Sequence, residues 1–300
     1  MDWSVYWFML PACIVIASVA MFSGISGAAL LTPLFLIGFP LLDAPRLTTV
    51  AAIGTALMLE TSGFGMGVYR YLHFQLVDLR TAGFLITATL PLGALGAMVA
   101  PRVPAQGLRL GYGMAMMALA ILLALELRHR VPATAELPPD PSSAITLCPG
   151  DLRQITTRGG ARYEYCPRGL AGQRWLSGTG AFLAGLISTG VGEATMPPLA
   201  RRSGFPIPVA AATSTVVVAG TVVGAASTHA VQLTLEGGFA AVPWNLIVWA
   251  VPGALIGAAI GTRLQGRVDE HAGKLFFAWL FFGIGLTFLV AFTVLADHFG

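Results

Sequence analysis

Several apolar segments of this chain are about 20 residues long and contain almost no charged side chain. That is the length at which an α-helix crosses a hydrocarbon core about 30 Å thick. Charged residues make up 10% of the chain and hydrophobic residues 56%, whereas soluble domains have roughly 25% charged residues. A soluble chain of 300 residues could not bury so much apolar surface. The sequence therefore predicts an all-α, polytopic membrane protein embedded in a lipid bilayer.

Two of the apolar stretches are interrupted by glycine and hydroxyl residues. The interruptions are residues 23–27 (SGISG) and residues 188–192 (STGVG), and proline follows each of them a few residues later. A helix broken within lipid leaves backbone groups unpaired, at a cost of several kcal/mol each. We therefore expect both breaks to lie inside protein or beside water.

The chain contains an internal repeat. Pro91, Gly96, Ala97 and Arg102 match Pro252, Gly257, Ala258 and Arg263 at one constant offset. Residues 38–40 likewise match residues 204–206, and residues 52–55 align with residues 212–215. This pattern predicts two repeated halves, 1–128 and 178–300, joined by an extramembrane insert over 129–177. Duplicated halves are typical of secondary transporters.

Each half is expected to contain a broken or re-entrant helix and three long transmembrane helices. The long segments are about 47–67, 81–100, 108–127, 209–231, 240–262 and 274–296. If each break forms a re-entrant hairpin, three spans remain in each half and the halves are inverted. If each break lies in a spanning helix, four spans result and the halves run parallel. Both alternatives place the two termini on one side.

Lysine and arginine favour the re-entrant alternative slightly, because cytoplasmic loops are enriched in these residues. In that arrangement only Arg46, Arg102 and Arg109 lie opposite the other basic residues. The protein is then a multi-pass protein of a bacterial inner membrane, with periplasmic termini and a cytoplasmic insert. The spanning alternative moves the insert outside. Within the insert, two β-prone runs flank a Gly-Gly turn, and Cys148 and Cys166 flank the runs. A periplasmic insert predicts a disulfide between them, and a cytoplasmic one predicts free thiols.

The two breaks indicate a site for an anion. A helix that restarts after a break presents free N–H groups and the positive end of its dipole. Glycine allows close approach of the backbone, and hydroxyl groups add donors. The alternative is that the glycines only permit close helix packing or a kink. The residues predicted to bind substrate are Ser23, Gly24, Ser26, Gly27, Thr55, Ser188, Thr189, Gly190, Gly192, Ser214 and Thr215.

Two carboxylates fall inside this apolar sequence. Glu60 lies in the middle of a long segment and Glu193 lies next to the second break. Ionisable groups within a membrane are candidates for function, so either of them is a candidate for coupling transport to protons. A structural alternative is that Glu193 caps its own helix and that Glu60 pairs with a buried polar group.

Other classes of function lack their usual signatures. The chain has no G-x-S-x-G, H-E-x-x-H or P-loop motif, and its histidines are scattered. We therefore expect no enzymatic activity, no catalytic residues, no metal site and no cofactor. The net charge of +3 is expected from cytoplasmic loops, and we do not expect nucleic acid as a partner.

The broken segments and the PxGAxxG-like segments resemble the TauE/SafE family of membrane permeases, the sulfite exporter family. Members contain glycine-rich breaks followed by proline, which correspond here to residues 24–33 (GISGAALLTP) and 190–198 (GVGEATMPP). Ser26 and Ala28 depart from the family's first glycine run, and Glu193 departs from the second. These departures indicate altered substrate or coupling.

The resemblance implies transport of small sulfur-containing anions, often as export. Sulfite, thiosulfate and organosulfonates such as sulfoacetate or taurine are the expected substrates. With substrate bound at the paired breaks, the expected mechanism is alternating access. The rival hypotheses are a passive anion channel and a membrane-embedded enzyme.

Overall fold

Helices make up most of the part of the chain that the computed structural model describes, which is residues 4–23, 26–128, 152–264 and 270–293. The first half contains α1 (Met9–Ser23), α2 (Ala28–Pro33), η1 (Leu34–Gly38), α3 (Phe39–Leu41), α4 (Thr49–His73), α5 (Leu79–Val99), η2 (Ala100–Arg102) and α6 (Ala105–Arg128). The second half contains α8 (Leu170–Ile187), α9 (Val191–Arg201), α10 (Ile207–Gly237), η3 (Phe239–Ala241), α11 (Trp244–Leu264) and α12 (Glu270–Thr293). Between them, β1 (Arg153–Thr156) and β2 (Arg162–Tyr165) form a hairpin.

The long helices confirm a polytopic membrane protein. Within the described residues, five helices are long and apolar enough to cross a membrane: α5, α6, α10, α11 and α12. A sixth span was expected at about 47–67. The corresponding helix, α4, is 25 residues long but is not among these five, because it includes Glu60 and several hydroxyl residues. Most of α4 is buried against other helices, so its polar side chains are enclosed by protein.

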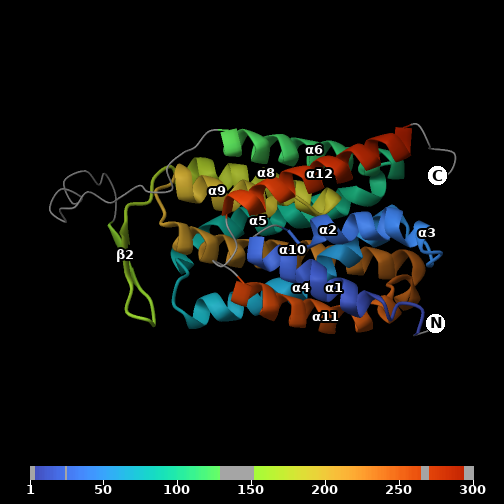
Figure 1. Cartoon of the computed structure of the whole chain (residues 1–300), viewed down its shortest axis with the longest axis horizontal. Helices are drawn as coiled ribbons and strands as arrows, with labels where there is room; N and C mark the ends of the chain where they lie inside the picture. Colours follow the sequence, from blue (N-terminus) through green and yellow to red (C-terminus); the bar gives the residue numbers. More distant parts are fainter. Residues whose placement is uncertain (1–3, 24–25, 129–151, 265–269, 294–300) are drawn as a thin grey trace.

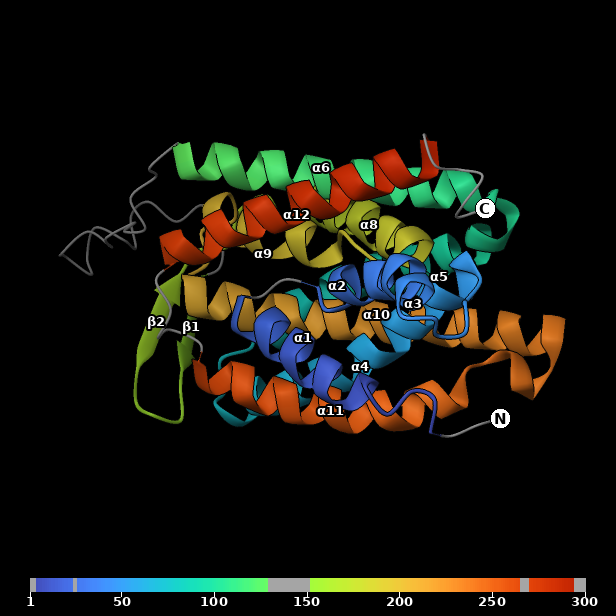
Figure 2. The same cartoon turned by 45° about the vertical axis from the view of Figure 1, so that its right-hand side comes forward.

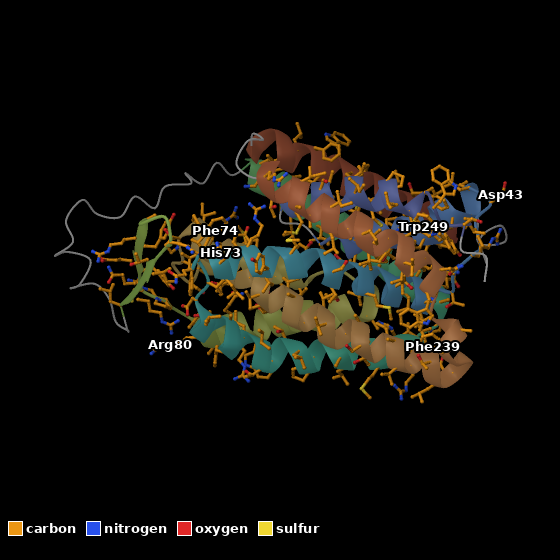
Figure 3. All side chains as sticks on the ribbon, turned by 90° about the horizontal axis from the view of Figure 1, so that it is seen from below. Asp43, His73, Phe74, Arg80, Phe239 and Trp249 are labelled. Carbon is orange, nitrogen blue, oxygen red and sulfur yellow. The ribbon has the colours of Figure 1, made fainter. Side chains whose placement is uncertain are left out.

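The two breaks are re-entrant, and the halves are inverted. Helices run along the long axis of the molecule, with the β-hairpin at one end and the start of α1 and the end of α12 at the other (Figure 1). The segment α2–η1–α3 returns to the end from which α1 entered, whereas α9 returns to the hairpin end (Figure 2). The connections between helices lie at opposite ends of the bundle in the same way: Asp43 and Phe239 lie at one end, and His73, Phe74 and Arg80 lie at the other (Figure 3). Of the two topologies open from the sequence, the structure has the one with inverted halves.

The repeated PxGAxxG-like segments are docking faces, and each one holds the broken helix of the other half. On α11, a Cβ atom added at Gly257 or at Gly261 would lie 2.4 Å from a backbone oxygen of α1. On α5, a Cβ atom at Gly96 would lie 2.1 Å from the Phe182 oxygen of α8. Small residues allow such close packing of membrane helices. The glycines therefore fix the position of α1 and α8, and with them the position of both breaks.

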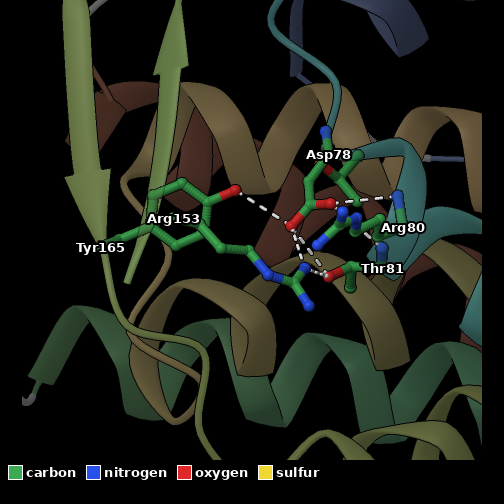
Figure 4. Close-up of polar contacts among 6 residues, drawn as sticks. Asp78, Arg80, Thr81, Arg153 and Tyr165 are labelled. Carbon is green, nitrogen blue, oxygen red and sulfur yellow. Dashed lines mark hydrogen bonds and ion pairs between the residues drawn. The ribbon is translucent and has the colours of Figure 1, made fainter. Parts of the chain in front are cut away.

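The β-hairpin is antiparallel, with Arg153 opposite Tyr165, and it confirms the two β-prone runs expected in the insert. It is attached to the helices through Asp78, which caps the N-terminus of α5 (Figure 4). Arg153 Nη1 donates to Asp78 Oδ2 at 2.5 Å, and the Tyr165 hydroxyl donates to the same oxygen at 3.0 Å. Asp78 N–H donates to Thr213 on α10. The network therefore joins the insert to both halves.

This network also shifts the pKa values of Asp78 and Tyr165. Burial alone would raise the pKa of Asp78, but hydrogen bonds from Thr81, Arg153 and Tyr165 outweigh burial and hold the pKa below its ordinary value. Burial, together with the neighbouring Asp78 carboxylate, raises the pKa of Tyr165 far above its ordinary value. Asp78 is therefore ionised and Tyr165 neutral at physiological pH.

Candidate functional site

The second break is a sharp turn between α8 and α9. Ser188 ends α8 in the left-handed conformation (φ 58°), and Gly190 precedes α9 with φ 118°. A side chain at Gly190 would be strained by this φ, and its Cβ would lie 3.3 Å from the Gly180 oxygen. The glycine is therefore required by the backbone path. The first break joins α1 to α2 over residues 24–27, with Gly27 as the N-cap of α2.

The tips of the two hairpins meet in the interior. The Thr32 hydroxyl on α2 lies 2.6 Å from the Ser188 hydroxyl, and both residues are fully buried. The backbone N–H of Ser26 interacts with the Glu193 carboxylate of the second break. The structure thus brings two groups of predicted residues together: Ser26 and Gly27 of the first break, and Ser188, Thr189, Gly190 and Glu193 of the second. The two groups are about 160 residues apart in the sequence.

Glu60 lies against the first break. It projects from α4, is buried, and accepts a hydrogen bond of 2.6 Å from the Ser26 hydroxyl. The N–H groups of Gly27 and Ala28 also interact favourably with its carboxylate, and Glu193 repels it. The pairing of Glu60 with a buried polar group, one of the two alternatives from the sequence, is thus observed, and its partner belongs to the break itself.

Glu193 is less well satisfied than Glu60. The N–H groups of Glu193 itself, Ser26 and Gly190 interact with its carboxylate. Neither of its buried carboxylate oxygens has a hydrogen-bond partner of standard geometry among the described residues. The buried hydroxyls of Thr189 and Thr55 are unpartnered as well. Buried polar groups are normally paired, so these atoms are candidates for contact with a bound ligand.

The remaining predicted residues are placed differently. Ser214 and Thr215 both donate to the Ala211 oxygen of their own helix, at 3.0 and 2.8 Å. Gly192 lies in the first turn of α9, where an added β-carbon would lie 3.9 Å from Val218 Cγ2. Gly24 and the side chain of Ser23 lie outside the described residues. A role for these five residues in binding stays a prediction.

Each break is supported by a side chain that replaces a missing backbone donor. Pro33 has no N–H to donate to the Ala29 oxygen, four residues earlier, and the hydroxyl of Tyr112 on α6 donates to that oxygen instead. Pro198 leaves the Ala194 oxygen free in the same way, and Gln173 Nε2 on α8 donates to it at 3.1 Å. Sequence reasoning missed both donors. The prolines signal that donors are needed, but not where in the chain they lie.

His229 supports the end of α8, and sequence reasoning missed it too. It is fully buried on α10, and its Nε2 donates to the Gly185 oxygen at 2.8 Å. The terminal carbonyl groups of a helix have no partner within the helix, so His229 serves as a cap for the broken end. The β-carbon of His229 is also packed against Gly54 on α4. Its Nε2 hydrogen bond therefore supports the last turn of α8 before the second break, while its buried Nδ1 has no hydrogen-bond partner among the described residues.

A small cavity of about 30 Å³ lies beside Glu60, between α1, α2, α4 and α11. This volume exceeds the roughly 10–15 Å³ that a single water needs. Among the described residues, Glu60 is the only carboxylic side chain in the cavity wall. The wall is otherwise formed by Cys13, Ile16, Ala17, Ala20, Met21, Gly27, Leu31, Leu59, Gly63, Phe64 and Ala254.

Within the described residues, no group of three or more His, Cys, Asp or Glu side chains is arranged to hold a metal ion. The groups that the structure brings together at the breaks are backbone amides, hydroxyls and two carboxylates. This set can bind a small anion or a proton.

Inverted halves, paired re-entrant hairpins and a buried polar site at their tips define a membrane transporter of the inverted-repeat class. The sulfite exporter TauE/SafE family model matches residues 9–288, nearly the whole chain, and the protein belongs to this family. The family consists of membrane transporters, so the protein is a transporter and not an enzyme. Searches of curated proteins and of solved structures found no match.

Proposed function

We propose that this protein exports small sulfur-containing oxyanions by alternating access, with the anion bound between the two hairpin tips. Membership of the TauE/SafE family makes it a sulfite-type anion transporter. Sulfite, thiosulfate and organosulfonates such as sulfoacetate or taurine are the proposed substrates. All of them have a tetrahedral or pyramidal sulfur centre with oxygens that accept hydrogen bonds from N–H and O–H donors.

The observation that supports this proposal best is the contact between the tips at Thr32 and Ser188. Together with the interaction of the Ser26 N–H with the Glu193 carboxylate, it brings the start of α2 close to the first turn of α9, and the two hairpins enter from opposite ends of the bundle (Figure 2). N-termini of helices bind anions without a buried cation. Ser26, Thr189 and the amides near Gly190 are the proposed donors. Because one hairpin enters from each side, movement of one half against the other exposes the same site to either face.

Protons are the proposed coupling ion. Glu60 and Glu193 interact with each other, and within the described residues neither is paired with Lys or Arg. Two ionised carboxylates in a dry site repel each other and any substrate anion. A proton on one of them relieves that repulsion.

Transport by leucine variants tests the binding site. Gly27 and Gly192 have room for a β-carbon, because the nearest side-chain atoms would lie 3.7 and 3.9 Å away. Gly27→Leu and Gly192→Leu should therefore fold but fill the site, and should abolish efflux of sulfite or thiosulfate from proteoliposomes. Gly65→Leu, at an exposed position with open space, is the matched control. Normal efflux by both site variants contradicts the proposal, and flux that does not saturate identifies a channel.

We further propose a bacterial inner membrane, with the β-hairpin in the cytoplasm and the termini in the periplasm. The support is charge: within the described residues, the end away from the hairpin has only Arg46, Arg102 and Arg109 among its basic residues. Cys166, at the hairpin end, is in a disulfide, which is unusual for the cytoplasm; Cys148 lies outside the described residues. Labelling of Cys166 in intact cells and in inverted vesicles with an impermeant thiol reagent, after reduction, decides between the two sides.

A further inference from the structure

The donors of the first break already have an anionic partner. The Ser26 hydroxyl donates to Glu60, and the Gly27 and Ala28 N–H groups face the same carboxylate. At the second break, by contrast, the Thr189 hydroxyl is buried and unpartnered. A substrate anion that binds between the tips must therefore compete with Glu60 for the donors of the first break.

A cavity beside Glu60 offers its carboxyl group a second position, away from the first break. The cavity of about 30 Å³ begins at its side chain and is lined by apolar groups of Leu59, Gly63 and Phe64 on its own helix. An ionised carboxylate is excluded from such surroundings, because transfer of a charge into an apolar environment is far costlier than transfer of a neutral group. A neutral carboxylic acid is not excluded in this way. The cavity therefore suits only the protonated form of Glu60.

We propose that Glu60 is an internal anion that exchanges with the substrate. Ionised, it occupies the donors of the first break. Protonated, it turns into the adjacent cavity and leaves those donors to the substrate anion. The proton is taken up from solvent onto a carboxylate oxygen of Glu60, and no other bond changes. One proton is thus bound for each anion bound. This proposal rests on the proposed function of the breaks as the anion site.

Few other titratable groups face Glu60. Glu193 approaches from α9, and Cys13 on α1 lines the far wall of the cavity. The first break contributes Ser26 and the amides of Gly27 and Ala28, α2 contributes Leu31, and α11 contributes Ala254. Tyr112 on α6 faces Glu193. Glu193 is therefore the competing location for the proton, and an experiment has to separate the two carboxylates.

Calorimetry of thiosulfate binding to the purified full-length protein separates them. Titrations in buffers with different ionisation enthalpies count the protons taken up. The wild-type protein is expected to take up about one proton per anion, and the same proton count is expected for the anion that Glu193→Gln binds, whatever the affinity of that variant. Glu60→Gln should bind thiosulfate with no uptake and with an affinity that does not change from mildly acidic to mildly alkaline buffer. Binding without uptake by the wild type, or uptake that persists in Glu60→Gln, overturns the proposal.

A second pair of variants tests the cavity itself. Gly63 and Gly65 both lie on α4, and a β-carbon at either position has no atom within 4 Å. Only Gly63 lines the cavity. Gly63→Val should hold Glu60 on the break and weaken thiosulfate binding about tenfold or more, while Gly65→Val should bind like the wild type. Elution as a single sharp peak and an unchanged melting temperature establish that both variants are folded. Equal affinity in folded Gly63→Val and Gly65→Val overturns the exchange.

The two proposals fail in different ways. If the wild-type protein neither binds nor transports thiosulfate, sulfite or an organosulfonate, the proposed function is wrong, and the exchange falls with it. If it binds and transports one of them without proton uptake, the anion site stands and only the exchange at Glu60 is wrong.

Discussion

The hydroxyl of Tyr112 should stabilise the first hairpin only because Pro33 lacks an N–H group. The Tyr112 hydroxyl donates to the Ala29 oxygen. Pro33 cannot donate to this oxygen, because proline has no backbone N–H group. The ring of Tyr112 packs against that of Phe288 at a tilt of 43°, with 4.7 Å between the ring centroids. Tyr112→Phe keeps this packing and removes only the oxygen. The substitution therefore isolates the hydrogen bond.

The expected cost follows from burial. Tyr112 is 1% exposed and Ala29 is fully buried, so water cannot replace the lost donor. A buried carbonyl left without a partner costs about 1–3 kcal/mol. Hydrogen bonds between helices in membrane proteins average about 0.6 kcal/mol, with a maximum of about 1.7 kcal/mol. Because Ala29 has no backbone donor, we expect about 1.5 kcal/mol, which is roughly tenfold in the unfolding equilibrium.

A double-mutant cycle with Pro33→Ala gives the decisive measurement. Alanine at position 33 restores the N–H that donates to Ala29 in a regular helix. In the Pro33→Ala background, Tyr112→Phe should then cost less than about 0.5 kcal/mol, so the coupling energy is about 1 kcal/mol. Reversible unfolding in mixed detergent micelles, followed by circular dichroism, measures all four proteins.

The reasoning is refuted if Tyr112→Phe has the same cost with and without Pro33. In that case the hydroxyl acts independently of the missing donor. It is refuted as well if the single variant is as stable as the wild type, since a buried carbonyl then tolerates the loss of its donor. Gln173→Leu with Pro198→Ala at the second break is an independent repeat of the cycle, because Gln173 Nε2 donates to the Ala194 oxygen.

Three shorter predictions concern the backbone and the insert. Gly190→Ala should destabilise the protein by about 1–3 kcal/mol because of its positive φ. Gly192→Ala should not, because its backbone is helical and the added β-carbon would make only an ordinary contact with Val218; thermal unfolding of both variants checks this. Gly257→Val should separate α1 from α11 and prevent assembly of a stable protein, as measured by yield and melting temperature, because its β-carbon would lie 2.4 Å from the Ile14 oxygen. Since the pKa of Asp78 is lowered by folding, its stabilising effect is complete at neutral pH and is lost only as the pH falls below its ordinary value of 3.8. Protease cleavage in the hairpin should therefore rise at such acidic pH in the wild type, and Asp78→Asn should be cleaved readily at neutral pH as well.

Features that depend on local sequence were predictable. The length and apolarity of the segments indicated the spanning helices, and the glycine and hydroxyl residues indicated both breaks. The β-hairpin followed from two β-prone runs around a Gly-Gly turn. Each of these depends on residues that are neighbours in the chain. Helix α8 begins earlier than expected, at Leu170, because its first turns are polar and therefore resemble the insert in composition.

Features that depend on packing between distant segments were not predictable. The matching segments around Gly96 and Gly257 could be recognised in the sequence as a repeat. The sequence did not indicate that each segment packs against the broken helix of the opposite half. The donors Tyr112, Gln173 and His229 belong to helices that the sequence does not connect with the breaks. Their hydrogen bonds follow from the three-dimensional arrangement, which hydrophobic patterning does not specify.

Two of the residues that depart from the glycine pattern of the family, Ser26 and Glu193, lie next to each other in the structure. Ser26 replaces a flexible position in one break and Glu193 in the other, and the sequence gives no reason to connect them. In space they face each other, because the Ser26 N–H interacts with the Glu193 carboxylate. The Ser26 hydroxyl interacts at the same time with Glu60. A serine with two donors thus lies between two carboxylates, so two of the three departures, Ser26 and Glu193, belong to one polar cluster at the point where the hairpins meet. A glycine at position 26 would lack the hydroxyl that holds Glu60 on the first break.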